Sequence, residues 1–146
     1  MSGTYVPKPE WLALEWHHAC LSADALAIQR CSACGRWRHQ PRRFCATCAS
    51  PDASFEPVAG TGIVCSLAVS HRSLDPGWQE HAPYATLVVD LTEGPRVLAA
   101  THAAPTDVGI GTPVHCTVER RTDDFAMVWA DPTTRSEEER RAAESR

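Results

Sequence analysis

Cys31-Ser-Ala-Cys34-Gly35 and Cys45-Ala-Thr-Cys48 are the two stretches that decide the fold of this chain, with ten residues between Cys34 and Cys45. Each stretch is a CxxC knuckle, and two knuckles can place four thiolates around one tetrahedral ion, which is the coordination of structural zinc sites. The usual separation of paired knuckles is about 15–20 residues, so this hairpin is short for its kind. Because protein sulfurs fill all four positions, we expect one structural Zn2+ per chain.

The segment around the knuckles is predicted to be a zinc ribbon. A short alternating strand from Leu26 to Gln29 leads into the first knuckle. Gly35 directly follows Cys34, where the backbone must turn back around the metal and a positive φ favours glycine. Structural zinc contributes on the order of 10–16 kcal/mol to the folding of small modules, so we expect the ribbon to be unfolded without metal. Four-sulfur sites also accept iron, which would make the chain an electron carrier with a coloured centre.

The N-terminal part is predicted to be a loose arm followed by a short amphipathic helix from Pro9 to Cys20. A proline fits the first turn of a helix, where its missing N–H costs nothing. Leu12, Trp16 and Cys20 recur at helical spacing, and His17 is turned away from that face. The sequence therefore predicts one apolar stripe on this helix.

Two tryptophans, Trp11 and Trp16, are a heavy apolar load for so short a helix. Two interpretations are open: the indoles dock on the chain's own ribbon or barrel, or they anchor a partner protein.

The rest of the chain is predicted to be a mainly β domain with five strands. The first strand is long and begins with two glycines, Gly60 and Gly62, which indicate a bulge or a sharp coil. A longer connection separates the third strand from the fourth, and this profile is typical of a five-stranded OB-fold barrel. A β-sandwich needs about seven strands and fits less well. The strands are expected near residues 58–70, 83–91, 96–102, 113–120 and 125–129.

Alternation of apolar residues predicts which way these strands face. In the first strand Ile63, Cys65, Leu67 and Val69 are expected on one face. The connection after it, with Trp78 in an exposed position, is expected to be a loop. The chain is thus divided into four parts: an arm and helix (1–24), a zinc ribbon (25–56), an OB-fold (57–132) and a charged tail that can be disordered (133–146).

The charge of the 146-residue chain is unevenly placed. Residues 1–50 hold six Lys/Arg and three Asp/Glu, whereas residues 51–146 hold eight and fifteen, so the halves carry +3 and −7. An acidic β half is a poor partner for a polyphosphate backbone, which disfavours a single-stranded nucleic-acid binder even though OB-folds commonly have that function. We keep it as an alternative.

Arginines gather on the ribbon, and two explanations of them are compatible. They partly neutralise a zinc tetrathiolate, which carries a net charge of −2. They also suit a phosphate-bearing ligand or an acidic protein surface. The candidate partner or ligand contacts are Trp11, Trp16, Arg36, Trp37, Arg38, Arg42 and Arg43.

No catalytic constellation is evident in the sequence, and we assign no catalytic residue. There is no GxSxG elbow, HExxH motif or phosphate-binding glycine loop. His102 and Asp90 lie on neighbouring predicted strands, but the register is not defined by the sequence. The chain has no apolar run of about 20 residues and no signal-like N-terminus, so a cytoplasmic, non-membrane location is expected.

The order of these parts resembles one known family. Four stretches carry this resemblance: Leu26-Ala-Ile-Gln-Arg-Cys-x-x-Cys-Gly35, Pro41-Arg-Arg-Phe-Cys-x-x-Cys48, Gly60-Thr-Gly-Ile-Val64 and Pro83-Tyr-x-x-x-Val-Val-Asp-Leu-x-x-Gly94. The chain is similar to domain-of-unknown-function family thirty-five, a rubredoxin-like zinc ribbon fused to an OB-fold. The resemblance covers roughly residues 9–132.

The resemblance implies a non-catalytic partner of thiolase-superfamily enzymes that act on acyl-CoA thioesters. Such relatives accompany sterol-carrier-type thiolases and the retro-aldolases that shorten steroid side chains. It further implies that the catalytic residues belong to the thiolase-like or aldolase chain, while the small subunit supports that chain and helps to enclose CoA. His39-Gln40 before Pro41 departs from the family pattern, in which an apolar residue is common.

Overall fold

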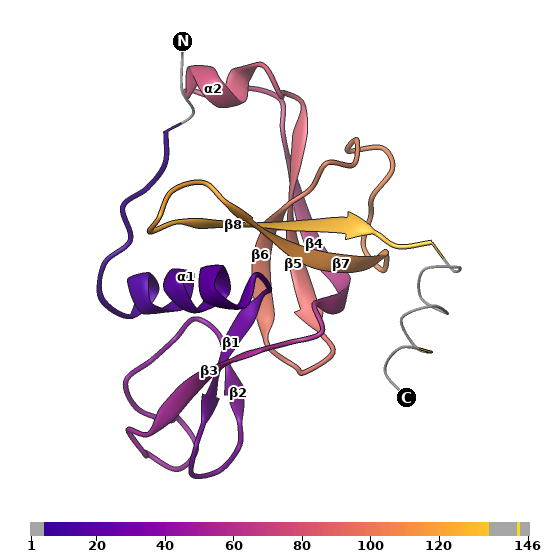
Figure 1. Ribbon diagram of the computed structural model, residues 1–146. Coiled ribbons are helices and arrows are strands. Elements are labelled where there is room, and N and C mark those ends of the chain that lie inside the picture. The colour runs from indigo at the N-terminus through magenta and orange to yellow at the C-terminus, as the bar shows by residue number, and fades with distance from the viewer. Residues whose placement is uncertain (1–4, 135–142, 144–146) are drawn as a thin grey trace.

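The computed structural model describes residues 5–134 and residue 143, so nearly all of the predicted charged tail lies outside the described residues. Figure 1 shows a small sheet and a five-stranded barrel, with helix α1 lying between them. Within the described part of the chain, no helix is long and apolar enough to cross a membrane. The elements are α1 (Trp11–Ala23), β1 (Ala27–Cys31), β2 (Trp37–Arg38), β3 (Ala53–Pro57), β4 (Thr61–Ser70), α2 (Pro76–Gln79), β5 (Tyr84–Leu91), β6 (Arg96–Ala100), β7 (Pro113–Arg120) and β8 (Ala126–Pro132).

The ribbon sheet has the strand order β2-β1-β3, and both neighbours of β1 run antiparallel to it. The central strand is the buried one: Ile28 is 0% exposed, and Ala27 and Cys31 are 1% exposed. Gly35 has a φ of 72°, which confirms the turn predicted after the first knuckle. The ribbon is therefore one well-buried strand with two partly exposed neighbours.

The second sheet closes on itself in the order β4-β5-β6-β8-β7. All its pairings are antiparallel except that of β6 with β8, where Ala100 lies opposite Trp129. Along β5, every second residue is buried, as the alternation of apolar residues predicts. The predicted mainly β fold, with an N-terminal helix, a zinc ribbon and a five-stranded OB-fold barrel, is confirmed.

The two glycines at the start of β4 lie where the backbone is crowded. A Cβ on Gly62 would meet the backbone oxygen of Asp90 at 2.5 Å, and one on Gly60, at φ +77°, would meet that of Cys116 at 2.6 Å. A bulge follows between Val64 and Ser66. Side chains larger than hydrogen at these positions would push β4 away from its neighbours.

Because of this bulge, the prediction of which β4 side chains point to the core is wrong. Val64, which was not in the predicted apolar set, is 1% exposed and lies in the core, whereas Ile63 is 52% exposed. Because an extra residue on one strand shifts the two-residue alternation, Leu67 packs against the core although Ile63 does not.

Helix α1 begins at Trp11, two residues later than predicted, and continues to Ala23. Asp24 then takes a left-handed conformation (φ 49°) and its N–H bonds to the oxygen of Cys20, which ends the helix. The predicted exposure of His17 is wrong: its side chain is buried together with that of Trp16. Both residues belong to the contacts that hold the helix between ribbon and barrel.

Candidate metal centre and the surfaces around it

The four knuckle cysteines come together at one point of the ribbon. Their sulfur atoms all lie within 4.8 Å of one another, and the Cys31–Cys48 and Cys34–Cys45 sulfur pairs are 3.6 Å apart. A tetrahedron with metal–sulfur bonds of about 2.3 Å has edges of about 3.8 Å, so the spacing fits a four-sulfur metal site. The geometry therefore supports a single closed centre.

Backbone N–H groups in the knuckles favour ionised sulfurs. The N–H groups of Cys48 and Thr47 lower the pKa of Cys45 to about 6, and that of Cys34 lowers the pKa of Cys31. The Ser50 N–H acts in the same direction on Cys48, but desolvation and the neighbouring thiols raise its pKa to about 11. Four thiolates thus need a cation among them before all can ionise, which is the chemistry of a metal-binding donor set.

Side chains of β1 fasten the two knuckles to the sheet. Arg30 donates from Nε to the Gly35 oxygen (3.1 Å), bridges to Glu56 (3.3 Å) and lies 4.8 Å from the centre of the Trp37 ring. Gln29 is 5% exposed, and its Oε1 accepts from Arg38 Nε (2.6 Å) and from the backbone N–H of Arg42 (2.8 Å). These two residues position the loop between the knuckles, and neither was among the predicted contact residues.

The candidate contact residues of the ribbon fall into two groups. Arg36, Trp37, Arg38 and Arg42 line a groove of about 650 Å3 between the ribbon and the β5–β6 turn, where Glu93 also lies. Arg43 lies apart from Arg36 and Arg38, and the structure does not gather all the arginines into one cluster.

Arg43 belongs to a second groove, of about 520 Å3, beside helix α1. Its guanidinium lies 5.9 Å from the centre of the Trp11 ring. Trp11 is 74% exposed and Phe44 is 62% exposed, so this groove presents large aromatic surface to solvent. Trp11 also has a φ of 57°, which is strained for a bulky residue. We refer to these residues as the Trp11–Phe44 groove.

Trp16 does not share that surface. It is 9% exposed, and its Nε1 donates to the oxygen of Ala27 on β1 (2.7 Å). Of the two interpretations left open for the tryptophans, docking on the chain's own ribbon describes Trp16.

The next residue in the helix holds the barrel instead of the ribbon. His17 Nδ1 accepts from the backbone N–H of Ala126, the first residue of β8 (3.1 Å). On the exposed side His18 meets Asp124 at 2.8 Å. Burial lowers the pKa of His17, which keeps the ring neutral and able to accept this bond. We call Trp16 and His17 the joint, because they tie α1 to the ribbon and to the barrel, respectively.

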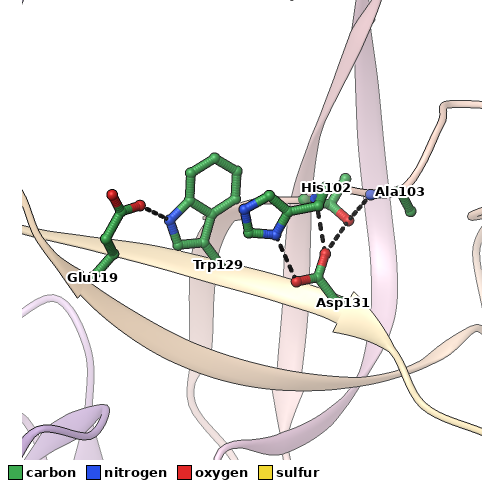
Figure 2. A network of polar contacts seen from close by, with 6 residues as sticks. His102, Ala103, Glu119, Trp129 and Asp131 are labelled. Atoms are coloured by element: carbon green, nitrogen blue, oxygen red, sulfur yellow. Dashed lines mark hydrogen bonds and ion pairs between the residues drawn. The ribbon is translucent and has the colours of Figure 1, made fainter.

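A polar network on the outside of the barrel was also missed by sequence reasoning. Figure 2 shows Asp131 on β8 facing His102: it accepts from the His102 backbone N–H (2.7 Å) and Nδ1 (2.8 Å), and also from Thr101 Oγ1 (3.0 Å). Burial alone would raise the pKa of Asp131, but these hydrogen bonds outweigh it and lower the pKa. Asp90, considered earlier beside His102, instead pairs with Arg96 (2.6 Å).

The His102 ring stacks on Trp129, with ring centres 3.8 Å apart, and Trp129 Nε1 donates to Glu119 (2.6 Å; Figure 2). The partners of His102 come from residues about 30 positions away, which local spacing does not reveal.

A four-sulfur ribbon followed by a closed five-stranded barrel defines a zinc-ribbon/OB-fold protein. Comparison with known families agrees: the family model for the ChsH2 rubredoxin-like zinc ribbon domain matches residues 23–53, and that for the ChsH2 C-terminal OB-fold domain matches residues 55–119. The chain belongs to the ChsH2 (DUF35) family, which confirms the resemblance seen in the sequence.

Solved structures show the same arrangement. A chain of the structure described as the "Ltp2-ChsH2(DUF35) aldolase" is 32% identical, with a TM-score of 0.78 over 88% of this chain and 100% of that chain. A DUF35-family protein of unknown function from Sulfolobus solfataricus has a TM-score of 0.55 at 15% identity, covering 83% of this chain and 85% of that one, and shows the fold alone.

Among curated proteins, a "Probable enoyl-CoA hydratase alpha subunit" from Thermomonospora curvata is 41% identical over 90 residues, which is 61% of this chain. The chain spans 28% of the length of that relative.

Proposed function

We propose that this chain is a non-catalytic subunit that binds and supports a thiolase-superfamily enzyme acting on acyl-CoA thioesters. The enzyme would be a sterol-carrier-type thiolase or a retro-aldolase that shortens steroid side chains. The observation that carries the proposal is the match to a ChsH2 chain of an aldolase, at 32% identity over the whole of that chain. In this arrangement the catalytic residues belong to the larger partner, and the small subunit helps to enclose the CoA group.

The metal in this proposal is one structural Zn2+ held by Cys31, Cys34, Cys45 and Cys48. Support comes from the sulfur spacing and from the zinc-ribbon family match. With four protein ligands, a tetrahedral ion has no open position for water or substrate, so its role is to hold the ribbon. The three cysteines outside this centre, Cys20, Cys65 and Cys116, form no disulfide, which suits a reducing compartment.

The Trp11–Phe44 groove is the surface we assign to the partner enzyme. Trp and Arg are the side chains most enriched among residues that dominate interface energies, and here an exposed indole lies beside Arg43. Arg36, Trp37, Arg38 and Arg42 in the neighbouring groove are the groups we assign to an acidic or phosphate-bearing feature of the complex.

Co-expression with a thiolase-superfamily protein from the same organism tests the proposal. We expect the two chains to elute together in size-exclusion chromatography, and the enzyme to lose most of its activity when expressed alone. Separate elution together with a fully active lone enzyme would refute the proposal.

A matched pair of variants tests the surface. Trp11→Ala with Phe44→Ala is expected to weaken the complex by tenfold or more, since aromatic anchors in interfaces are worth at least 1–2 kcal/mol each, by an order-of-magnitude estimate. Leu74→Ala, which changes a side chain that is 94% exposed on the loop before α2, is the control and should leave complex formation unchanged.

A second candidate is an accessory part of an enoyl-CoA hydratase, favoured by the 41% identity to part of such a subunit. Co-elution with a hydratase in place of the thiolase-like protein, and stimulation of hydration but not of carbon–carbon bond cleavage, would favour this candidate.

A further inference from the structure

A cleft of about 470 Å3 lies between helix α1 and the barrel strands β5, β6 and β8. Thr86 on β5 and Leu98 and Ala100 on β6 form its floor, while Trp16 on α1 lines the facing wall. The short helix α2 contributes Trp78, which the sequence analysis expected to lie exposed in a loop. Trp78 instead packs on Tyr84, with ring centres 5.3 Å apart.

The lining is mainly apolar and leaves hydrophobic surface uncovered. Leu98 is 62% exposed although it lines a concave site, and the aromatic side chains of Trp16, Trp78, Tyr84 and Phe125 line the same site. Sites for small molecules have volumes of about 300–1,000 Å3 and combine apolar and aromatic walls with a few polar groups. This cleft has the size and the lining of such a site.

His39, from the loop between the knuckles, supplies a polar group at the edge of the cleft. Its Nδ1 is buried and has no hydrogen-bond partner among residues 5–134, and its ring packs on Trp16 with centres 5.0 Å apart. Burial lowers the pKa of His39 to about 4, so the ring is neutral and offers one donor and one acceptor. A buried polar atom without a partner costs about 1–3 kcal/mol, and a turn of the ring toward a ligand oxygen in the cleft would remove part of that cost.

The surroundings also decide what kind of ligand fits. OB-folds bind extended polymers on the face of their second and third strands, which here are β5 and β6. In this chain α1 and the His39 loop stand across that face, and the joint fixes α1 to both β1 and β8. A continuous groove for a polymer is thereby closed to a short cleft.

We propose that this cleft is a binding site for a small, neutral, ring-containing apolar molecule that carries a hydroxyl or carbonyl oxygen. The floor and the aromatic walls contact the rings, and the oxygen bonds to His39. All the residues that line the cleft belong to this chain. The inference therefore goes beyond the proposed role as a subunit and does not depend on it.

Naphthalene and 2-naphthol are the probes, because they share a ring system and differ by one hydroxyl. Titrated into the 15N-labelled, zinc-loaded chain, both are expected to shift the indole signals of Trp16 and Trp78, while those of Trp11 and Trp37 stay in place. The hydroxyl should make 2-naphthol bind about three- to tenfold more tightly than naphthalene, as expected for one added hydrogen bond. In His39→Phe that difference should disappear while naphthalene still binds.

Thr86→Phe fills the floor of the cleft and should weaken both probes by at least tenfold. Thr117→Phe makes the same change at an exposed position on the outer face of β7, away from the cleft, and should bind as the wild type does within twofold. Melting curves of both variants check that they are folded. Unchanged binding to Thr86→Phe, shifts centred on Trp11, or no binding of either probe would overturn the proposal, whatever becomes of the partner enzyme.

Discussion

The ribbon and the barrel are both small β structures, but they are held together by different means. The ribbon has a two-residue strand, β2, and its fully buried side chains come almost entirely from β1 and the knuckles. The barrel closes a five-strand ladder around Val64, Leu87, Val89 and Val97, each no more than 1% exposed. Small modules with few buried apolar residues depend on cross-links or metals. We therefore expect the ribbon to depend on its metal and the barrel to be independent of it.

Metal removal tests this difference with the largest expected effect. A chelator, or Cys45→Ser, should unfold the ribbon, because structural zinc contributes on the order of 10–16 kcal/mol to modules of this kind. The barrel amides should keep dispersed signals in 1H–15N spectra, while those of β1 to β3 collapse. Cys65→Ser, at a half-buried cysteine of β4 outside the metal centre, is the control and should leave the ribbon folded. If ribbon and barrel melted together, the two would be one cooperative unit.

A change in the barrel core should give the opposite result. Leu87→Ala removes a side chain that is 0% exposed and is expected to cost about 2–5 kcal/mol of unfolding free energy. Zinc content of the folded chain, measured by metal analysis, should stay at one per chain. Leu98→Ala, at an exposed position on β6, should change stability by less than about 0.5 kcal/mol. Loss of zinc from Leu87→Ala would show that the ribbon relies on the barrel.

The joint shows what coupling between the two regions requires. His17→Ala leaves the N–H of Ala126 without its partner in a buried position, at a cost of about 1–3 kcal/mol. We expect faster hydrogen exchange along α1 and at the start of β8, and His17→Asn, which restores an acceptor, should recover part of the loss. His18→Ala removes only an exposed pair with Asp124 and should cost less than about 1 kcal/mol. If His17→Ala and His18→Ala lowered the free energy of unfolding equally, the bond between His17 and Ala126 would not be what ties α1 to the barrel.

The knuckles, β4, β5 and His17 show which features of the fold the sequence reveals and which it does not. Knuckle spacing and the alternation in β5 are local patterns, and both predict the structure correctly. The facing of β4 failed because one bulge, whose position depends on pairing with β5, reverses the alternation. His17 was taken as exposed because its helical position looks polar, whereas its buried surroundings come from Ala126, over one hundred residues later.

The pH dependence of stability tests the burial of His39, which lies in the loop between the knuckles. The pKa of His39 is about 4 in the folded chain and near 6.5 when unfolded, so the unfolded state binds more protons between these values. The contribution of His39 is complete above pH 6.5 and is lost as the pH falls toward 4. Between pH 7.5 and 5.5 the wild type should lose about 1 kcal/mol more than His39→Phe, measured by urea unfolding. Zinc content is measured at each pH. If the stability of the wild type and of His39→Phe fell equally with pH, the His39 ring would be accessible to water in the folded chain.

The smallest expected effect concerns the outside of the barrel, where two carboxylates each meet a histidine. Asp131 accepts three hydrogen bonds that join the end of β6 to β8, whereas Asp124 accepts one from His18 (Figure 2 shows the first site). Both are partly exposed, so water screens the charges and limits the gain to about 1 kcal/mol or less per pair. Asp131→Ala should therefore cost about 1 kcal/mol and Asp124→Ala clearly less, as differences in urea midpoint at constant slope. If Asp124→Ala had the larger effect, the single bond between His18 and Asp124 would contribute more to the free energy of unfolding than the three bonds that Asp131 accepts.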